Sequence, residues 1–349
     1  MLQNILLNWY LKNKRNLPWR NTTNPYIIWL SEVILQQTRV PQGLPYFQVF
    51  IKKYPTVKKL AEASNDEIMK LWQGLGYYSR ARNMHTTAIL IHTQFKGIFP
   101  DNYTAILKLK GIGTYTAAAI ASFAFNEPIA VLDGNVFRVL ARLYAIDEPI
   151  NSTSGKKLFT VLAQTFLNVN EPALHNQAMM ELGALVCKPQ KPLCNECPLV
   201  NNCLAFLQGK QQFFPVKVKN VKVRNRYFSY FYFLVHKQTC IYQRKAGDIW
   251  QNLFDLPLLE WDQQVDNEII LNELKNKNWF SPTKKQSLYL AMQTKHILTH
   301  QRIFANFYIV KLINKPQMGK EFIWINPTEL KKYAIPRLLD KFLKEQKLI

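Results

Sequence analysis

The 349-residue sequence has no apolar run as long as a membrane span, although apolar residues make up 48% of it. We also expect no secretory signal, because residues 1–12 show the spacing of an amphipathic helix and contain no cleavage site of small residues. We therefore expect a reducing compartment, which argues against disulfides. Outside one group of four cysteines there is only Cys240. These absences predict a globular protein of the reducing cytoplasm with no membrane partner.

Acidic residues are also few. The chain has 23 Asp and Glu against 45 Lys and Arg, which gives a formal net charge of +22. Residues 1–208 contain 21 basic and 12 acidic residues, and residues 209–349 contain 24 and 11, so both halves carry the excess. A charge this far beyond what solubility needs predicts a long polyanion as partner, with a basic surface of no function as the alternative.

The patterning of the chain changes after residue 208, and its length suffices for two domains. Residues 1–208 consist of amphipathic stretches divided by short turns and predict a mostly helical domain. Residues 209–226 contain six basic residues and no acidic one, as expected of a basic linker between domains. Residues 227–349 alternate as strands, with helical patterns at 267–275 and 327–344, and predict an α+β domain. The helices expected in the first domain are 5–14, 27–37, 46–54, 66–73, 80–93, 114–125, 134–144, 156–165 and 177–186.

Four cysteines, Cys187, Cys194, Cys197 and Cys203, follow one another with the spacing C-x6-C-x2-C-x5-C. The first gap is long for a zinc ribbon, whose paired ligands are usually two to four residues apart. An iron–sulfur cluster tolerates irregular spacing, because each cysteine reaches a different corner of a larger object. The spacing therefore favours an iron–sulfur cluster, and a zinc site or paired disulfides are the alternatives.

Residues 109–123 have the pattern of a helix, a Gly-x-Gly turn and a second helix. Without Cβ atoms, Gly111 and Gly113 allow backbone N–H groups to approach a phosphate, and the following helix start favours negative charge. Thr114 is the expected N-cap. This is the layout of a helix–hairpin–helix that binds a DNA backbone, although a purely structural turn has the same pattern.

Two acids stand out. Asp133 lies where an apolar stretch meets a helix, so we expect it to cap that helix and to be held ionised by the first N–H groups. Glu32 lies inside a very apolar helix that begins at Asn24-Pro25, where desolvation would raise its pKa and make it a proton donor. A charged and a protonated carboxyl form the pair that cleaves a glycosidic bond, although each acid taken alone is more often structural.

The sequence resembles the MutY-type adenine DNA glycosylases, within the helix–hairpin–helix superfamily that includes endonuclease III. Seven blocks carry the resemblance in the family's order and spacing across residues 1–208. They are the four cysteines and the segments Leu17-Pro-Trp-Arg, Trp29-Leu-Ser-Glu-Val-Ile-Leu-Gln-Gln-Thr, Leu71-Trp-Gln-Gly-Leu-Gly-Tyr-Tyr-Ser-Arg-Ala-Arg-Asn, Leu109-Lys-Gly-Ile-Gly-Thr-Tyr-Thr-Ala, Leu132-Asp-Gly-Asn-Val and Asn176-Gln-Ala-Met-Met-Glu-Leu-Gly-Ala.

The resemblance implies a base excision repair hydrolase, a monomer at the bacterial nucleoid. It would remove adenine paired with 8-oxoguanine or guanine in double-stranded DNA. It implies a [4Fe–4S] cluster on the four cysteines. It implies that Glu32 protonates the extruded adenine and later positions water. It implies that Asp133 stabilises, or briefly bonds, the sugar cation, with Tyr115 and Asn135 beside these acids. The implied substrate-binding residues are Trp19, Arg20, Leu35 and Gln177 around the base, and Gln37 and Tyr77 at the gap left by base flipping.

Bifunctional lyases of the endonuclease III type carry a lysine where this chain has Tyr115. The resemblance therefore implies a monofunctional glycosylase that leaves an abasic site. An endonuclease III-like glycosylase with lyase activity is one alternative. A non-catalytic iron–sulfur protein that binds damaged DNA is the other.

The second half resembles the Nudix-like C-terminal domain of the same enzymes in two segments, Cys240-Ile-Tyr-Gln-Arg-Lys and Ile249-Trp-Gln-Asn-Leu-Phe-Asp-Leu-Pro. The acidic helix of Nudix hydrolases is missing, so we expect no nucleotide hydrolysis. Where the family presents Phe-Ser-His to the damaged guanine, this chain has Leu298-Thr-His300. Thr299 and His300 keep the polar groups, whereas Leu298 replaces the aromatic residue.

The implied architecture is two helical lobes with DNA between them, followed by the Nudix-like domain. One lobe would contain residues 21–132, with the hairpin at 109–123. The other would combine residues 1–20 with 133–208, including the iron–sulfur loop 187–203.

Overall fold

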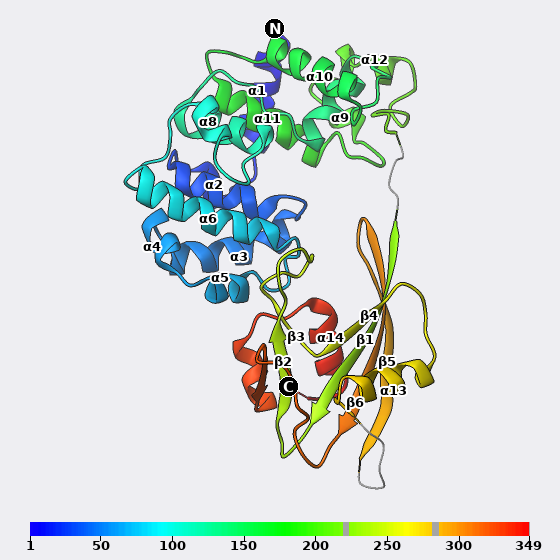
Figure 1. Ribbon diagram of the computed structural model, residues 1–349. Helices are drawn as coiled ribbons and strands as arrows, with labels where there is room; N and C mark the ends of the chain where they lie inside the picture. The colour runs from blue at the N-terminus through cyan, green and yellow to red at the C-terminus, as the bar shows by residue number, and fades with distance from the viewer. Residues whose placement is uncertain (219–222, 281–285, 349) are drawn as a thin grey trace. The chain divides into compact units, whose positions relative to one another are not determined.

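The computed structural model describes residues 1–218, 223–280 and 286–348 and divides into two compact units (Figure 1). One unit comprises Met1–Glu62 and Asn83–Lys219, and the other comprises Ala63–Arg82 and Asn220–Ile349. The expected linker 209–226 includes residues 219–222, which lie outside the described residues. The domain boundaries at 208 and 226 remain predictions.

The helices account for nearly all regular structure up to residue 208, as the sequence predicts. In chain order they are α1 (Leu2–Asn13), η1 (Pro18–Arg20), α2 (Pro25–Leu35), α3 (Val40–Lys53), α4 (Val57–Glu62), α5 (Asn65–Trp72), α6 (Ser79–Gln94), α7 (Tyr103–Leu107), α8 (Thr114–Phe125), α9 (Gly134–Leu143), α10 (Thr153–Phe166), α11 (Pro172–Leu185), η2 (Cys194–Glu196), η3 (Val200–Asn202) and α12 (Leu204–Leu207). The short α4 was not expected, and α7, the helix expected before the Gly-x-Gly turn within 109–123, ends before residue 109. Helices α3, α10 and α11 begin several residues earlier than the pattern indicates.

Two helices of the first unit, α2 and α11, position the site through their packing. Helix α2 packs against α8 and α3, and α11 packs against α1, α8 and α9. Local chemistry sets where the key helices begin: the Asn24 side chain accepts the Tyr26 N–H at the start of α2, with Pro25 in the first turn. Since α2 contacts neighbours on two sides, all positions from Tyr26 to Ile34 except Ile27 are buried.

The second unit contains two sheets (Figure 1). The first has the order β4-β1-β6-β5, with β1 parallel to β6 and the other pairs antiparallel, and the second has the antiparallel order β3-β2-β7. The strands are β1 (Arg224–Leu234), β2 (Thr239–Gln243), β3 (Phe254–Asp255), β4 (Leu258–Trp261), β5 (Ser287–Ile297), β6 (Gln301–Lys311) and β7 (Phe322–Ile325), and the helices are α13 (Asn267–Asn276), η4 (Pro327–Lys332) and α14 (Arg337–Glu345).

Helices cover both faces of the four-stranded sheet. Ile270 of α13 joins the buried cluster that contains Phe231 and Tyr308, and Phe342 of α14 stacks on Phe307 from the other face. The α+β prediction is confirmed. The single helix expected at 327–344 is instead η4 followed by α14, because Pro336 cannot continue a helix and also restricts the residue before it.

None of the helices in the described ranges combines the length and the apolar character that a membrane-spanning segment needs.

Candidate active site

Glu32 lies on α2 with only 7% of its surface exposed. The hydroxyl of Tyr115, on α8, donates a hydrogen bond to Glu32 Oε2 at 2.5 Å. Burial raises the pKa of Glu32 to about 7, and the charge of Asp133 adds to this, while the Tyr115 bond and the charge of Arg20 oppose it. A carboxyl group with this pKa can hold a proton and release it near neutral pH.

Asp133 is the N-cap of α9, as the sequence predicts. Its Oδ1 accepts the N–H groups of Asn135 (2.8 Å) and Val136 (2.7 Å), and its Oδ2 accepts the side-chain amide of Asn135 (2.7 Å). Burial raises the pKa of Asp133 above its ordinary value, and these three hydrogen bonds oppose that shift. The expected bonds are present, but burial outweighs them. The two carboxyl groups therefore differ in hydrogen bonding: Glu32 accepts the Tyr115 hydroxyl, whereas Asp133 accepts three N–H groups.

The residues predicted to surround the base lie in the same unit. Trp19 is buried edge-on against Phe47 (ring centroids 5.1 Å apart), and Leu35, the last residue of α2, is half-buried. Arg20 lies near enough to Glu32 to lower its pKa by charge. Gln177, on α11, accepts a hydrogen bond from the hydroxyl of Tyr10 at 2.6 Å.

Glu181 is a residue of this site that the sequence argument did not single out. It lies on α11, is completely buried and accepts hydrogen bonds from both Arg15 and Arg20. The sequence did contain an indication of Glu181: like Glu32, it is an acid inside an apolar helix, and such an acid needs a partner. The partners could not be identified, since they lie more than 160 residues away in the chain.

The Gly-x-Gly turn joins α7 to α8. Gly111 has φ +77°, and a Cβ there would lie 2.5 Å from the Cβ of Asn83, so this position requires glycine. The expectation that Thr114 caps α8 is wrong: Gly113 is the N-cap, and no side chain caps the helix start. The first N–H groups of α8 are thus left to a partner outside the helix, as a phosphate contact requires.

All four cysteines line one cavity at the end of α11, together with Arg142 and apolar side chains. Backbone N–H groups bond two of the sulfurs, from Leu199 to Cys197 and from Ala205 and Phe206 to Cys203. Within the described ranges no three His, Cys, Asp or Glu side chains are placed to hold a single metal ion. Four sulfur donors around one cavity with N–H···S bonds fit a cysteine-bound iron–sulfur cluster.

A buried arginine connects this cavity with Asp133. Arg138 donates to the carbonyl of Cys187 (2.6 Å) and to the Asn135 side-chain oxygen (2.8 Å), and Asn135 in turn bonds Asp133. One rigid arrangement of hydrogen bonds therefore includes a cysteine of the loop and the cap of α9.

The predicted contacts with the DNA duplex fall in both units. Gln37 follows α2 in the first unit and is exposed, with φ +54°. Tyr77, Thr299 and His300 lie in the second unit and are exposed, and the hydroxyls of Tyr77 and Thr299 are 2.9 Å apart. Thr299 and His300 form the tight turn between β5 and β6, closed by the Leu298 N–H on the Gln301 carbonyl (2.8 Å).

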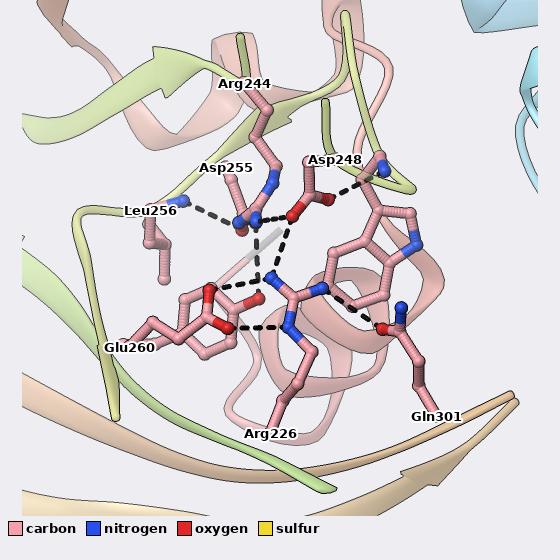
Figure 2. A network of polar contacts seen from close by, with 9 residues as sticks. Arg226, Arg244, Asp248, Asp255, Leu256, Glu260 and Gln301 are labelled. Carbon is pink, nitrogen blue, oxygen red and sulfur yellow. Dashed lines mark hydrogen bonds and ion pairs between the residues drawn. The ribbon is translucent and has the colours of Figure 1, made fainter. Parts of the chain in front are cut away.

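A network of polar side chains around the buried Arg226 and Arg244 supports the base of this turn (Figure 2). Arg226, at the start of β1, bonds Glu260 and Asp248 at 2.7 and 2.9 Å and also reaches Gln301, the residue after His300, at 3.2 Å. Arg244 bonds the same Asp248 oxygen as Arg226, Oδ2, at 2.7 Å. The turn is thus tied to the sheet by side chains as well as by strand pairing.

Family comparisons agree with this geometry. The sequence model of the HhH-GPD superfamily base excision DNA repair protein matches residues 30–163, and that of the NUDIX domain matches residues 229–345. The solved structure of a thermostable thymine-DNA glycosylase is 28% identical, with a TM-score of 0.55 over 59% of this chain and 95% of that chain. Fold and site thus define a helix–hairpin–helix base excision DNA repair protein with a second, Nudix-like domain.

Two named relatives narrow the class. The adenine DNA glycosylase of Buchnera aphidicola subsp. Baizongia pistaciae is 35% identical over 344 residues, which are 97% of this chain and 94% of that protein. The adenine DNA glycosylase of Homo sapiens is 42% identical over 216 residues, 59% of this chain and 40% of that protein. The chain belongs to the adenine DNA glycosylase family, which confirms the resemblance.

Proposed function

We propose that the chain is a monofunctional DNA glycosylase that hydrolyses the N-glycosidic bond of adenine paired with 8-oxoguanine or guanine in double-stranded DNA. The main support is Glu32, a buried carboxyl group on an apolar helix, bonded to Tyr115 and raised in pKa to about 7 beside Asp133. Family membership supports adenine as the base.

The reaction begins once adenine has left the stack, because the bond cannot be reached inside the duplex. Glu32 gives its proton to a ring nitrogen of adenine, the bond to the sugar breaks, and its electron pair leaves with the base. The positive charge left on the sugar is stabilised by the carboxylate of Asp133, which Asn135 and the α9 N–H groups hold in place. Water adds to the sugar and returns a proton to Glu32, leaving free adenine and an abasic site.

The site offers no amine for a Schiff base at the position after the hairpin turn, which is Tyr115. Its hydroxyl instead bonds Glu32. The sugar–phosphate backbone therefore stays intact after excision.

The four cysteines would hold a [4Fe–4S] cluster, which when bound ties the ends of the loop 187–203 together. Lys188 and Lys191 of that loop would then meet phosphates, as would the uncapped start of α8 at Gly111 and Gly113. Gln37 and Tyr77 would fill the gap left by the base, and Thr299 and His300 would contact the damaged guanine. As a DNA repair enzyme acting as a monomer, it would work at the nucleoid.

A single-turnover excision assay tests this function. Duplexes with one adenine opposite 8-oxoguanine, guanine or thymine are incubated with excess protein and treated with alkali to reveal abasic sites. We expect cleavage of the first two duplexes only, and no trapping of protein on DNA by borohydride. Glu32→Gln should abolish excision while retaining lesion binding. The control Glu171→Gln, at an exposed glutamate of the same unit, should leave excision unchanged. Near-normal turnover by Glu32→Gln would refute the assignment of the acid, and efficient trapping would indicate a lyase.

A further inference from the structure

Glu181 binds two arginines with one carboxylate. Its Oε1 accepts the Arg15 N–H and Nε and the Arg20 Nη1, each at 2.9 Å, and its Oε2 accepts Nη2 of Arg15 at 2.6 Å and of Arg20 at 2.7 Å. Burial alone would raise the pKa of Glu181, but these bonds outweigh it and hold the pKa at about 2. Glu181 is therefore a permanent anion.

The two terminal nitrogens of Arg20, Nη1 and Nη2, each donate to a different oxygen of the Glu181 carboxylate. A planar guanidinium held by two parallel bonds has a defined position and orientation. Arg20 also lies over the ring of Tyr10, with its Cζ 5.6 Å from the ring centroid.

Helix α11 also supplies Gln177, which contacts Tyr10. Gln177 precedes Glu181 by four residues on α11, so the two side chains lie on one face. Gln177 accepts the Tyr10 hydroxyl at 2.6 Å. Two of the predicted base-binding residues are therefore held by other side chains: Glu181 and Tyr10 hold Arg20, and Tyr10 holds Gln177.

Arg20 has an electrostatic effect beyond this set, because its positive charge lowers the pKa of Glu32. The groups that act on Glu32 come from three elements: Tyr115 from α8, Asp133 at the start of α9 and Arg20 from η1. Of these, Arg20 favours loss of the proton by its charge, and its own charge is partly neutralised by Glu181. A buried ion cluster of this kind adds little to the stability of the fold, so we look for its role in the position and charge of Arg20.

We propose that Glu181 is a positioning residue of the active site, which holds the Arg20 guanidinium in place and offsets its charge so that Glu32 retains its proton for catalysis. The proposal rests on the proposed function.

The test is the pH profile of single-turnover adenine excision by Glu181→Gln. Glutamine keeps the shape and one acceptor oxygen but removes the negative charge, so Arg20 acts on Glu32 with its full charge. We expect the basic limb of the profile to move to lower pH by about one unit, the size typical of a nearby charge. Excision should fall up to about tenfold at pH 8 and stay within about twofold of the wild type at pH 6.

Two further variants separate positioning from folding. Phe159→Leu creates a cavity in the same unit at a fully buried residue of α10, so it should lower the unfolding midpoint without moving the profile. Arg20→Gln removes the charge itself and should move the basic limb to higher pH, which keeps the proposal testable if Glu181→Gln does not fold.

A wild-type profile for Glu181→Gln would overturn the proposal, as would a loss of rate that is equal at all pH values and matched by Phe159→Leu at the same unfolding midpoint. An unchanged limb in Arg20→Gln would also overturn it. If the wild-type protein leaves the 8-oxoguanine duplex intact, the proposed function fails and this inference with it. If the wild type is active, any of the other outcomes removes only the role of Glu181.

Discussion

Replacing Glu32 by glutamine is expected to stabilise the folded protein, and to do so increasingly as the pH rises. The pKa of this carboxyl is raised from 4.5 to about 7 by burial. Between these two values the folded state keeps a proton that the unfolded state has lost. The stabilising contribution of this proton to the free energy of unfolding is therefore complete below pH 4.5 and is lost as the pH rises toward 7.

The size of the effect follows from the shift. The free energy of unfolding of the wild type falls by about 1.4 kcal/mol for each pH unit within this window. From pH 5 to pH 8 the loss amounts to about 2.5 kcal/mol, because the window is only partly entered at pH 5 and is complete at pH 8. The glutamine of the variant would carry no charge at either pH, so the difference between variant and wild type should grow by that amount.

The assay is urea unfolding of both proteins at a series of pH values, followed by circular dichroism. Only the difference between variant and wild type is used, since contributions from the cysteine loop are common to both. Glu171→Gln is the matched control: its carboxyl is exposed, so its stability difference should not change with pH. If the Glu32→Gln difference were the same at pH 5 and pH 8, the carboxyl would not be desolvated in the fold and its assignment as proton donor would lose its physical basis.

Three other changes test separate parts of the structure. Tyr115→Phe removes the hydrogen bond that lowers the pKa of Glu32, so the basic limb of the excision profile should move to higher pH; an unmoved limb would show that the hydroxyl does not act on the acid. Cys203→Ser should reduce the iron and acid-labile sulfide bound per chain to less than half of the wild-type amount by chemical analysis, and undiminished iron would contradict a four-cysteine cluster. Arg226→Met should lower the free energy of unfolding by about 2 kcal/mol, because Asp248 and Glu260 lose a cation. The control Lys277→Met, at an exposed pair, should lower it by less than about 0.5 kcal/mol. Equal effects in urea unfolding would mean that the network adds no stability.

The sequence predicted those features of the fold that depend on neighbouring residues. Asn24-Pro25 and Asp133 begin helices as expected, because a cap needs only a side-chain oxygen and the next N–H groups. Strand β5 was not predicted, because none of its residues is buried and the strand therefore has no consistently apolar face. The cap of α8 was assigned one residue too late, because Gly113 offers no side chain to indicate it.

For the site, the sequence indicated which residues matter but not how their charges interact. Glu32 was expected to hold a proton from the apolar character of its helix alone, and the structure agrees. Asp133 has the local hydrogen bonds that were expected to keep it ionised, but burial still raises its pKa above the ordinary value. Local bonding is visible in a sequence, whereas desolvation depends on everything that packs around a residue.

The sequence by itself determined the class of this protein, through the spacing of its cysteines, its Gly-x-Gly turn and two acids in their helical settings. Only the tertiary structure decided which groups share the charge of the site: it brings Glu181 to Arg15 and Arg20, and Tyr115 to Glu32, across 83 to 166 positions of the chain. The physical reason is that helix periodicity determines which face of each helix is buried, whereas the packing of α2, α8 and α11 determines which buried faces meet.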